Sequence, residues 1–171
     1  MGKFYEGVCN DLIAYVRAIA FLNAVPAESE QDASRRKQVA RRKQAQPERL
    51  TRGQMMRAKG EESDIAEVDA GLYLVDYLME AGPFTYGASG PIPLNWQDFR
   101  SWQDTTGIDL QPWEAKTLRR LSAAYLGQMQ KAEEIDCPPP WVPVMTETDR
   151  AEVSKNVQTA LRMLMTTRPK R

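Results

Sequence analysis

The chain has 171 residues, and its 23 basic side chains cancel its 23 acidic ones. This balance excludes attraction of the whole protein to nucleic acid or to an anionic membrane, and the absence of histidine excludes imidazole catalysis and histidine-ligated metal or haem. Cys9 and Cys137 form no paired metal motif, and we expect both to stay thiols in a reducing cytoplasm. No stretch approaches the length of an apolar membrane span.

An amphipathic helix is predicted for residues 1–25. Apolar side chains recur there at spacings of three and four, and Pro26 ends the pattern. The predicted apolar face consists of Phe4, Val8, Leu12, Tyr15 or Val16, Ile19 and Leu22. Two roles are open for this face: it packs on the rest of the fold, or it meets another chain.

Residues 26–62 are poor in large apolar side chains and cannot build a core by themselves. From Arg35 to Lys59 this segment holds ten basic residues and one acidic residue. We predict a basic polar linker or a solvated helix that ends at Pro47. Its role is a linker, a contact for an acidic protein, or a contact for nucleic acid, although no aromatic residue offers base stacking. The residues that would contact a polyanion are Arg35, Arg36, Lys37, Arg41, Arg42 and Lys43.

A second helix is predicted to begin at Ser63 or Asp64, where Asp64 and Glu67 have the spacing of a capping box. Its apolar stripe consists of Ile65, Val68, Leu72, Val75 and Leu78 or Met79, and the helix ends at Gly82 and Pro83. The glycine- and proline-rich stretch that follows, up to Leu94, predicts an irregular loop rather than a hairpin.

A short helix is predicted over residues 96–106. Asn95 is a good N-cap, Asp98 occupies the third helical position, and Leu94 can pack on Phe99 as a hydrophobic staple. Gly107 suits the left-handed residue after the helix end. One side of this helix presents Trp96, Phe99 and Trp102.

A long helix is predicted to open at Pro112, with Glu114 in its first turn, and to run to about Ile135. Trp113, Leu121 and Tyr125 belong to its apolar side, while we expect the side chains of Lys116, Arg119, Arg120 and Lys131 to remain in water. The prolines at 138–140 then predict an extended arm that leads to Trp141. A last amphipathic helix is expected from Thr146, with the stripe Val153, Val157, Leu161 and Leu164.

Together these patterns predict an all-α protein of about five helices. The expected parts are an N-terminal helix (1–25), a basic linker (26–62), a compact central domain (63–145), and a C-terminal helix with a basic tail (146–171). Capping and solvation explain the carboxylates, the cysteines have no histidine base, and no phosphate-binding loop is present. We therefore expect no enzymatic activity, no cofactor and no metal site.

Aromatic residues are the remaining candidates for function. We interpret Trp96 and Trp113 as core residues, and Trp102 and Trp141 as the better candidates for an interface, because tryptophan is enriched at binding hot spots. The full set of candidate partner-binding residues is Trp96, Phe99, Trp102, Trp113, Tyr125 and Trp141.

The stretch from Asp69 to Trp141 resembles tail assembly chaperones of long-tailed phages, in particular the extension domain of the frameshifted chaperone. The likeness is densest in residues 91–126, PIPLNWQDFRSWQDTTGIDLQPWEAKTLRRLSAAYL. Its motifs are Leu94-Asn95-Trp96, Thr106-Gly107, Ile108 with Leu110, Pro112-Trp113-Glu114, and the face of Leu118, Leu121, Ser122 and Tyr125. The N-terminal residues and the last helix lie outside the resemblance.

The resemblance implies a non-catalytic chaperone in the host cytoplasm that binds the tape-measure protein and tail-tube subunits and leaves the finished tail. One alternative is a small regulatory or nucleic-acid-binding protein that acts through residues 35–59, and another is a structural component of the tail. A membrane partner is not expected, and a homo-oligomer is left open.

Overall fold

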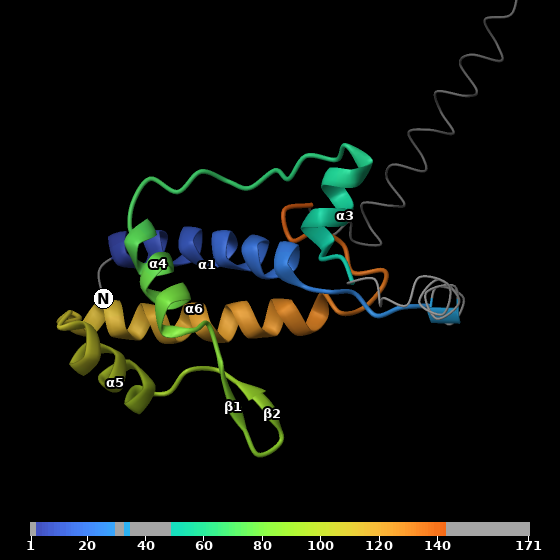
Figure 1. Cartoon of the computed structure of the whole chain (residues 1–171). Coiled ribbons are helices and arrows are strands. Elements are labelled where there is room, and N and C mark those ends of the chain that lie inside the picture. Colours follow the sequence, from blue (N-terminus) through green and yellow to red (C-terminus); the bar gives the residue numbers. More distant parts are fainter. Residues whose placement is uncertain (1–2, 30–32, 35–48, 143–171) are drawn as a thin grey trace, which may run out of the picture. The chain divides into compact units, whose positions relative to one another are not determined.

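The computed structural model describes residues 3–29, 33–34 and 49–142 (Figure 1). This part of the chain contains five complete helices and one two-stranded sheet, so the fold is predominantly helical, as predicted. The helices are α1 (Lys3–Asn23), α3 (Arg52–Lys59), α4 (Leu72–Ala81), α5 (Trp96–Thr106) and α6 (Pro112–Lys131), and the strands are β1 (Thr85–Gly87) and β2 (Gly90–Ile92). The helix expected from Thr146 lies outside the described residues.

Helix α1 packs lengthwise along α6, and the two helices run in the same direction (Figure 1). Near their N-terminal ends the ring of Tyr5 lies 5.0 Å from that of Trp113. Just beyond their C-terminal ends the backbone N–H of Ala27 donates to the carbonyl of Glu133. Of the two roles open for the first helix, the structure therefore shows packing on the rest of the fold.

The buried face of α1 differs in part from the predicted one. Leu12 and Val16 are fully buried as predicted, and they share the main core cluster with Leu74, Leu78, Phe99, Leu118 and Leu121. Cys9 and Ala20, which the prediction omitted, are buried as well. Small side chains at these positions allow the backbones of two helices to approach closely.

Helix α4 begins at Leu72, so the predicted start at Ser63 or Asp64 is wrong. Residues 61–70 form no helix and connect α3 to α4 as a strap that runs along α1 (Figure 1). An extended residue advances the chain by about 3.3 Å and a helical residue by about 1.5 Å. An extended chain therefore spans the separation between the end of α3 and the start of α4 with fewer residues than a helix would need. Val68 still packs on the core from the strap. The predicted apolar stripe is therefore confirmed for Val68, Val75 and Leu78, whereas Leu72 is exposed and Leu74, which the prediction omitted, is fully buried.

The stretch predicted to be an irregular loop contains an antiparallel hairpin. Tyr86 pairs with Pro91, and Gly87 pairs with Gly90 across a two-residue turn. The fully buried hydroxyl of Ser122 on α6 accepts a hydrogen bond from the N–H of Leu94 and donates one to the carbonyl of Pro83, both at 2.8 Å. A single α6 side chain thus holds both ends of the hairpin segment.

The predicted caps of α5 and α6 are confirmed. Asn95 Oδ1 accepts from the N–H groups of Gln97 and Asp98, and Asp98 Oδ2 accepts from the N–H of Asn95 at 2.7 Å. Gly107 follows α5 in the left-handed conformation. Glu114 Oε2 accepts from the N–H of Gln111 at 2.7 Å at the start of α6. Helix α6 ends at Lys131, one turn before the predicted end.

Helix α3 was not predicted, and it gives one residue of the basic segment a structural role. Thr51 and Gln54 form its capping box. The guanidinium of Arg52 donates to the carbonyls of Ala132, Glu134 and Ile135 after the end of α6, and it lies 4.9 Å from the ring centroid of Phe21. Arg52 therefore joins the C-terminal ends of α1 and α6 instead of facing a partner.

Candidate functional site

Three of the six candidate partner-binding residues lie in the interior. Phe99, Trp102 and Tyr125 are each less than a tenth exposed. Phe99 and Tyr125 belong to the main core, and Trp102 packs against Tyr77 with ring centroids 5.1 Å apart. These side chains stabilise the fold and expose less than a tenth of their surface, which contradicts the interpretation of Trp102 as an interface residue.

Trp113 and Trp141 are partly buried against the two ends of α1. Trp113 lies against Tyr5, and Trp141 meets the ring of Phe21 edge-on at 5.5 Å. Trp141 thereby closes a second, smaller core cluster built on Phe21, Ala24 and Ala132. Trp141 therefore packs the arm after α6 against the C-terminal part of α1.

Trp96 is the member of the set with the greatest exposure, at 48 %. It is the first residue of α5, directly after the Asn95 cap. Three residues advance a helix by about 300°, so each step of three rotates the side chain by about 60°, and Trp96 lies about 120° away from buried Trp102. The interpretation of Trp96 as a core residue is therefore wrong, because the buried face of α5 is centred on Phe99 and Trp102.

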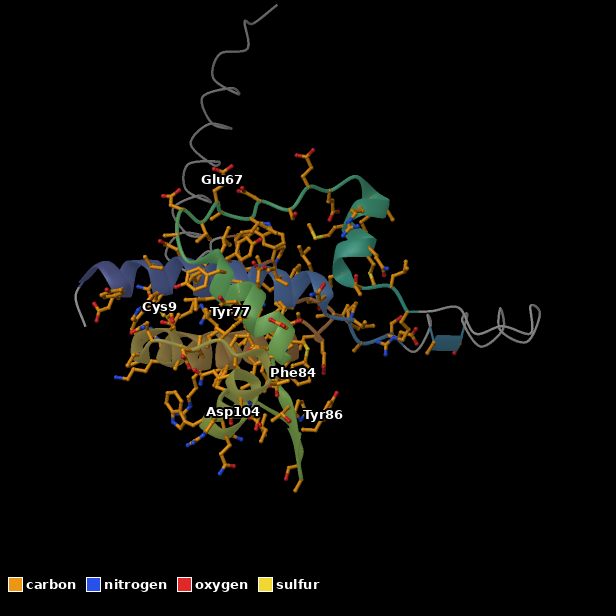
Figure 2. The ribbon with its side chains drawn as sticks, turned by 60° about the vertical axis from the view of Figure 1, so that its left-hand side comes forward. Cys9, Glu67, Tyr77, Phe84, Tyr86 and Asp104 are labelled. Atoms are coloured by element: carbon orange, nitrogen blue, oxygen red, sulfur yellow. The ribbon has the colours of Figure 1, made fainter. Side chains whose placement is uncertain are left out.

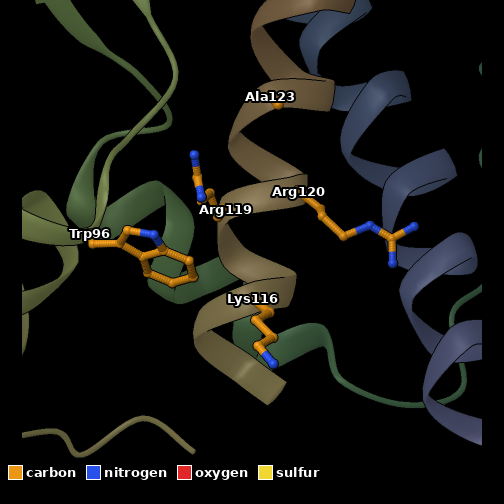
Figure 3. Close-up of a pocket in the computed structure, with 5 residues that line it drawn as sticks. All are labelled: Trp96, Lys116, Arg119, Arg120 and Ala123. Atoms are coloured by element: carbon orange, nitrogen blue, oxygen red, sulfur yellow. The ribbon is translucent and has the colours of Figure 1, made fainter. Parts of the chain in front are cut away.

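The exposed indole of Trp96 adjoins basic side chains of α6. The guanidinium of Arg119 lies 5.0 Å from the ring centroid, a cation–π arrangement (Figure 3). The two elements enclose an open hollow of about 450 Å³. We name this feature the basic groove, and its lining residues are Trp96, Lys116, Arg119, Arg120 and Ala123.

The spacing of the α6 residues explains the chemistry of the basic groove. Positions 119 and 120 follow position 116 by three and four residues and precede position 123 by four and three, so all four lie on neighbouring turns of one helix face. The groove lining contains no carboxylate, and among the described residues no Asp or Glu oxygen lies within 4 Å of the three cationic groups. The groove is therefore a positively charged surface with an aromatic wall.

The two carboxylates closest in sequence to the groove residues are already engaged. Asp98 caps α5, and Glu114 accepts hydrogen bonds from Gln111 and, at 2.5 Å, from the hydroxyl of Tyr73. Burial raises the pKa of Tyr73 well above its usual range, and the hydrogen bond to Glu114 and its negative charge add to this rise. Tyr73 is therefore a hydrogen-bond donor at neutral pH, and its hydroxyl helps to fix the Glu114 side chain in the first turn of α6.

Other hollows in the described part of the chain have less coherent chemistry. One of about 540 Å³ is lined by both Arg49 and Glu133, whose opposite charges oppose each other's effect on a charged ligand. Another, of about 350 Å³, is lined in part by Trp102, whose buried indole Nε1 has no hydrogen-bond partner. Neither combines an exposed aromatic ring with charges of one sign.

The cysteines and carboxylates of the described residues are dispersed over the fold. Cys9 is buried, Cys137 is partly buried, and both are free thiols. Glu67 of the strap and Asp104 of α5 lie on opposite edges of the fold (Figure 2), and no three His, Cys, Asp or Glu side chains of the described ranges gather where they could hold a metal ion.

The six candidate polyanion contacts, Arg35 to Lys37 and Arg41 to Lys43, lie outside the described residues. Arg49 and Arg52 of the same basic run are described, and both donate hydrogen bonds to backbone carbonyls of this chain.

No helix in the described ranges is both long and apolar enough to span a membrane. Comparisons with protein-family models, with curated proteins and with solved structures found no match to the chain.

Proposed function

We propose that this protein is a non-catalytic tail assembly chaperone of a long-tailed phage. It acts in the host cytoplasm during tail morphogenesis and binds the tape-measure protein, tail-tube subunits, or both. The observation that carries the proposal is the resemblance of residues 91–126. These residues form one continuous stretch of the fold, from β2 through α5 to α6.

The motif residues of this stretch have structural roles that fit a binding scaffold rather than an active site. Asn95 and Gly107 bound α5, Glu114 caps α6, and Ser122 holds the hairpin. Leu118 and Leu121 fill the core. A protein that presents such a scaffold with one exposed indole is suited to binding another protein, since exposed tryptophan is a frequent anchor at interfaces.

The proposal is tested by recovering the tagged full-length chain from infected cells. Retained proteins are identified by mass after washing at low salt and at about 0.5 M salt, where interactions between exposed charges are strongly screened. We expect tape-measure or tail-tube protein to remain after the high-salt wash. Tag alone, expressed in the same infected cells, is the control. Recovery of nucleic acid alone, lost at high salt, would contradict the proposal.

The alternative of a structural tail component is separated by a second measurement. Purified phage particles are probed for the chain with an antibody against it. A chaperone leaves the assembled tail, so we expect the chain in assembly intermediates and not in particles. Detection in particles at a fixed stoichiometry would assign it to the tail structure instead.

A further inference from the structure

We propose that the basic groove binds an acidic segment of a partner protein, in which carboxylates flank an apolar side chain. This inference deepens the proposed function and rests on it for the identity of the partner protein. The chemistry of the segment is argued only from the groove residues Trp96, Lys116, Arg119, Arg120 and Ala123.

The charge of the groove selects an anionic ligand. Lys116 and Arg120 are exposed on α6, and they have no acidic partner among the described residues. Cationic side chains without acidic partners on adjoining helix turns attract a negatively charged ligand and repel a positively charged one. A segment with two or more carboxylates would supply the missing partners.

The aromatic wall adds a requirement for apolar surface. Arg119 lies over the face of Trp96, so the indole holds the guanidinium in place while the N–H groups at the guanidinium edge remain able to bind a carboxylate in a bidentate manner. The exposed part of Trp96 and the methyl group of Ala123 form an apolar part of the lining. An apolar side chain beside the carboxylates would cover this part.

The single aromatic ring of the groove favours a protein segment over nucleic acid. Single-stranded nucleic acid is usually bound by a long basic channel with several aromatic side chains, on which successive bases stack. The basic groove has one aromatic ring, and Arg119 lies over one face of it. It therefore lacks a series of stacking platforms.

The densest acidic stretch of the described chain cannot fill its own groove. This stretch is the strap, which carries Glu61, Glu62, Asp64, Glu67 and Asp69. The strap runs along α1, whereas the groove lies between α5 and α6. Glu67 of the strap lies on the opposite edge from Asp104 of α5 (Figure 2). Among the described residues, the strap therefore does not supply the occupant, and we assign the groove to a segment of another molecule.

The test measures binding of short fluorescent peptides to the purified full-length chain by anisotropy. The first peptide has glutamates that flank leucines, the second has Gln in place of every Glu, and the third has Ala in place of every Leu. We expect the first peptide to bind most tightly and its affinity to fall as salt rises. The variant Lys116→Glu with Arg120→Glu should bind it about tenfold or more weakly.

Matched variants separate the groove from general charge effects. Arg17→Glu with Arg57→Glu makes the same change in net charge at exposed positions outside the groove, and this variant should bind the first peptide nearly as the native chain does. Trp96→Ala should remove the preference for the leucine peptide over the alanine peptide. Far-UV circular dichroism of every variant checks that the helices are intact.

Four results would overturn the proposal. They are absence of binding by the first peptide, equal binding of the glutamine peptide, unchanged binding by the Lys116 and Arg120 variant, and tighter binding of a labelled single-stranded oligonucleotide through the same residues. A salt-sensitive dimer that this variant abolishes, without peptide binding, would assign the groove to a second copy. If peptide binding holds but infected cells yield no tail protein, the proposed function fails and the groove assignment stands.

Discussion

The hydroxyl of Ser122 forms hydrogen bonds with two backbone groups, the N–H of buried Leu94 and the carbonyl of partly buried Pro83. It accepts the first bond and donates the second, and it is fully buried. We expect Ser122→Ala to lower the free energy of unfolding by about 2–4 kcal/mol, because a buried polar group that loses its partner costs about 1–3 kcal/mol. Urea denaturation followed by circular dichroism measures this change.

The control for this prediction is Ser101→Ala, on the exposed side of α5. Its side chain has no hydrogen bond of this kind among the described contacts, so the free energy of unfolding should change by no more than about 0.5 kcal/mol. Equal effects of the two substitutions would show that the contacts of Ser122 contribute nothing particular to stability.

Arg52 and Arg57 lie on the same short helix but have different environments. The guanidinium of Arg52 donates to three carbonyls beyond α6 and lies over Phe21, whereas Arg57 is exposed. We expect Arg52→Ala to cost about 2–3 kcal/mol of unfolding free energy, since it removes charged hydrogen bonds and a cation–π contact. Arg57→Ala should cost about 0.5 kcal/mol or less. Thermal and urea unfolding of both variants tests the difference, and equal costs would contradict a structural role for Arg52.

At the scale of elements, caps explain which helices were predicted well. Helix α5 has its N-cap, its boxed acid and its terminal glycine within the sequence itself, and its bounds agree with the prediction. The expected helix from Ser63 had only the acidic spacing of a capping box and an apolar stripe. That local signal is weaker than the need to connect α3 to α4 along α1 with few residues, so the chain stays extended as far as Gly71.

The junction between strap and α4 depends on Gly71. Its φ of 84° lies in the left-handed region, and a Cβ there would approach Leu12 Cδ1 to 3.1 Å and Val8 Cγ1 to 3.2 Å. We expect Gly71→Ala to destabilise the fold by about 2–4 kcal/mol, because backbone strain adds to overpacking against α1. Gly60→Ala has a similar φ of 73° but open space, so it should cost only about 1 kcal/mol. Urea midpoints distinguish the two, and similar costs would mean that the approach to α1 is not tight.

At the scale of the whole molecule, α1 and α6 share one core although some 90 positions separate them in sequence. Leu12 from α1 and Leu118 from α6 are both fully buried in the main cluster. We expect Leu12→Ala to cost about 2–5 kcal/mol. Circular dichroism and tryptophan fluorescence should shift to the same lower urea midpoint, since one core unfolds as one unit.

The control for this prediction is Leu50→Ala, at a position that is 49 % exposed, which should leave both midpoints nearly unchanged. Loss of helical signal at lower urea without any shift in tryptophan fluorescence would show that α1 unfolds separately. That result would support an N-terminal helix that folds separately from the central helices.

The candidate site was predictable only in part. Trp96 was among the partner-binding candidates, and Lys116, Arg119 and Arg120 were expected to be in water. The spacing of these three on α6 could have indicated a basic face. Their union with Trp96 could not be read from the sequence, because it depends on how the turn at Gly107 places α5 against α6.

The sequence by itself determined the helical class, the caps of α5 and α6, the apolar residues of α6 and the lack of histidine chemistry. These features follow from periodicity, capping and composition, which act over a few residues. Only the tertiary structure decided that α1 packs along α6, that the strap stays extended, that Arg52 holds the ends of two helices, and that Trp96 rather than Trp102 faces solvent. Each of these depends on contacts between residues far apart in the chain, where burial outweighs local preference.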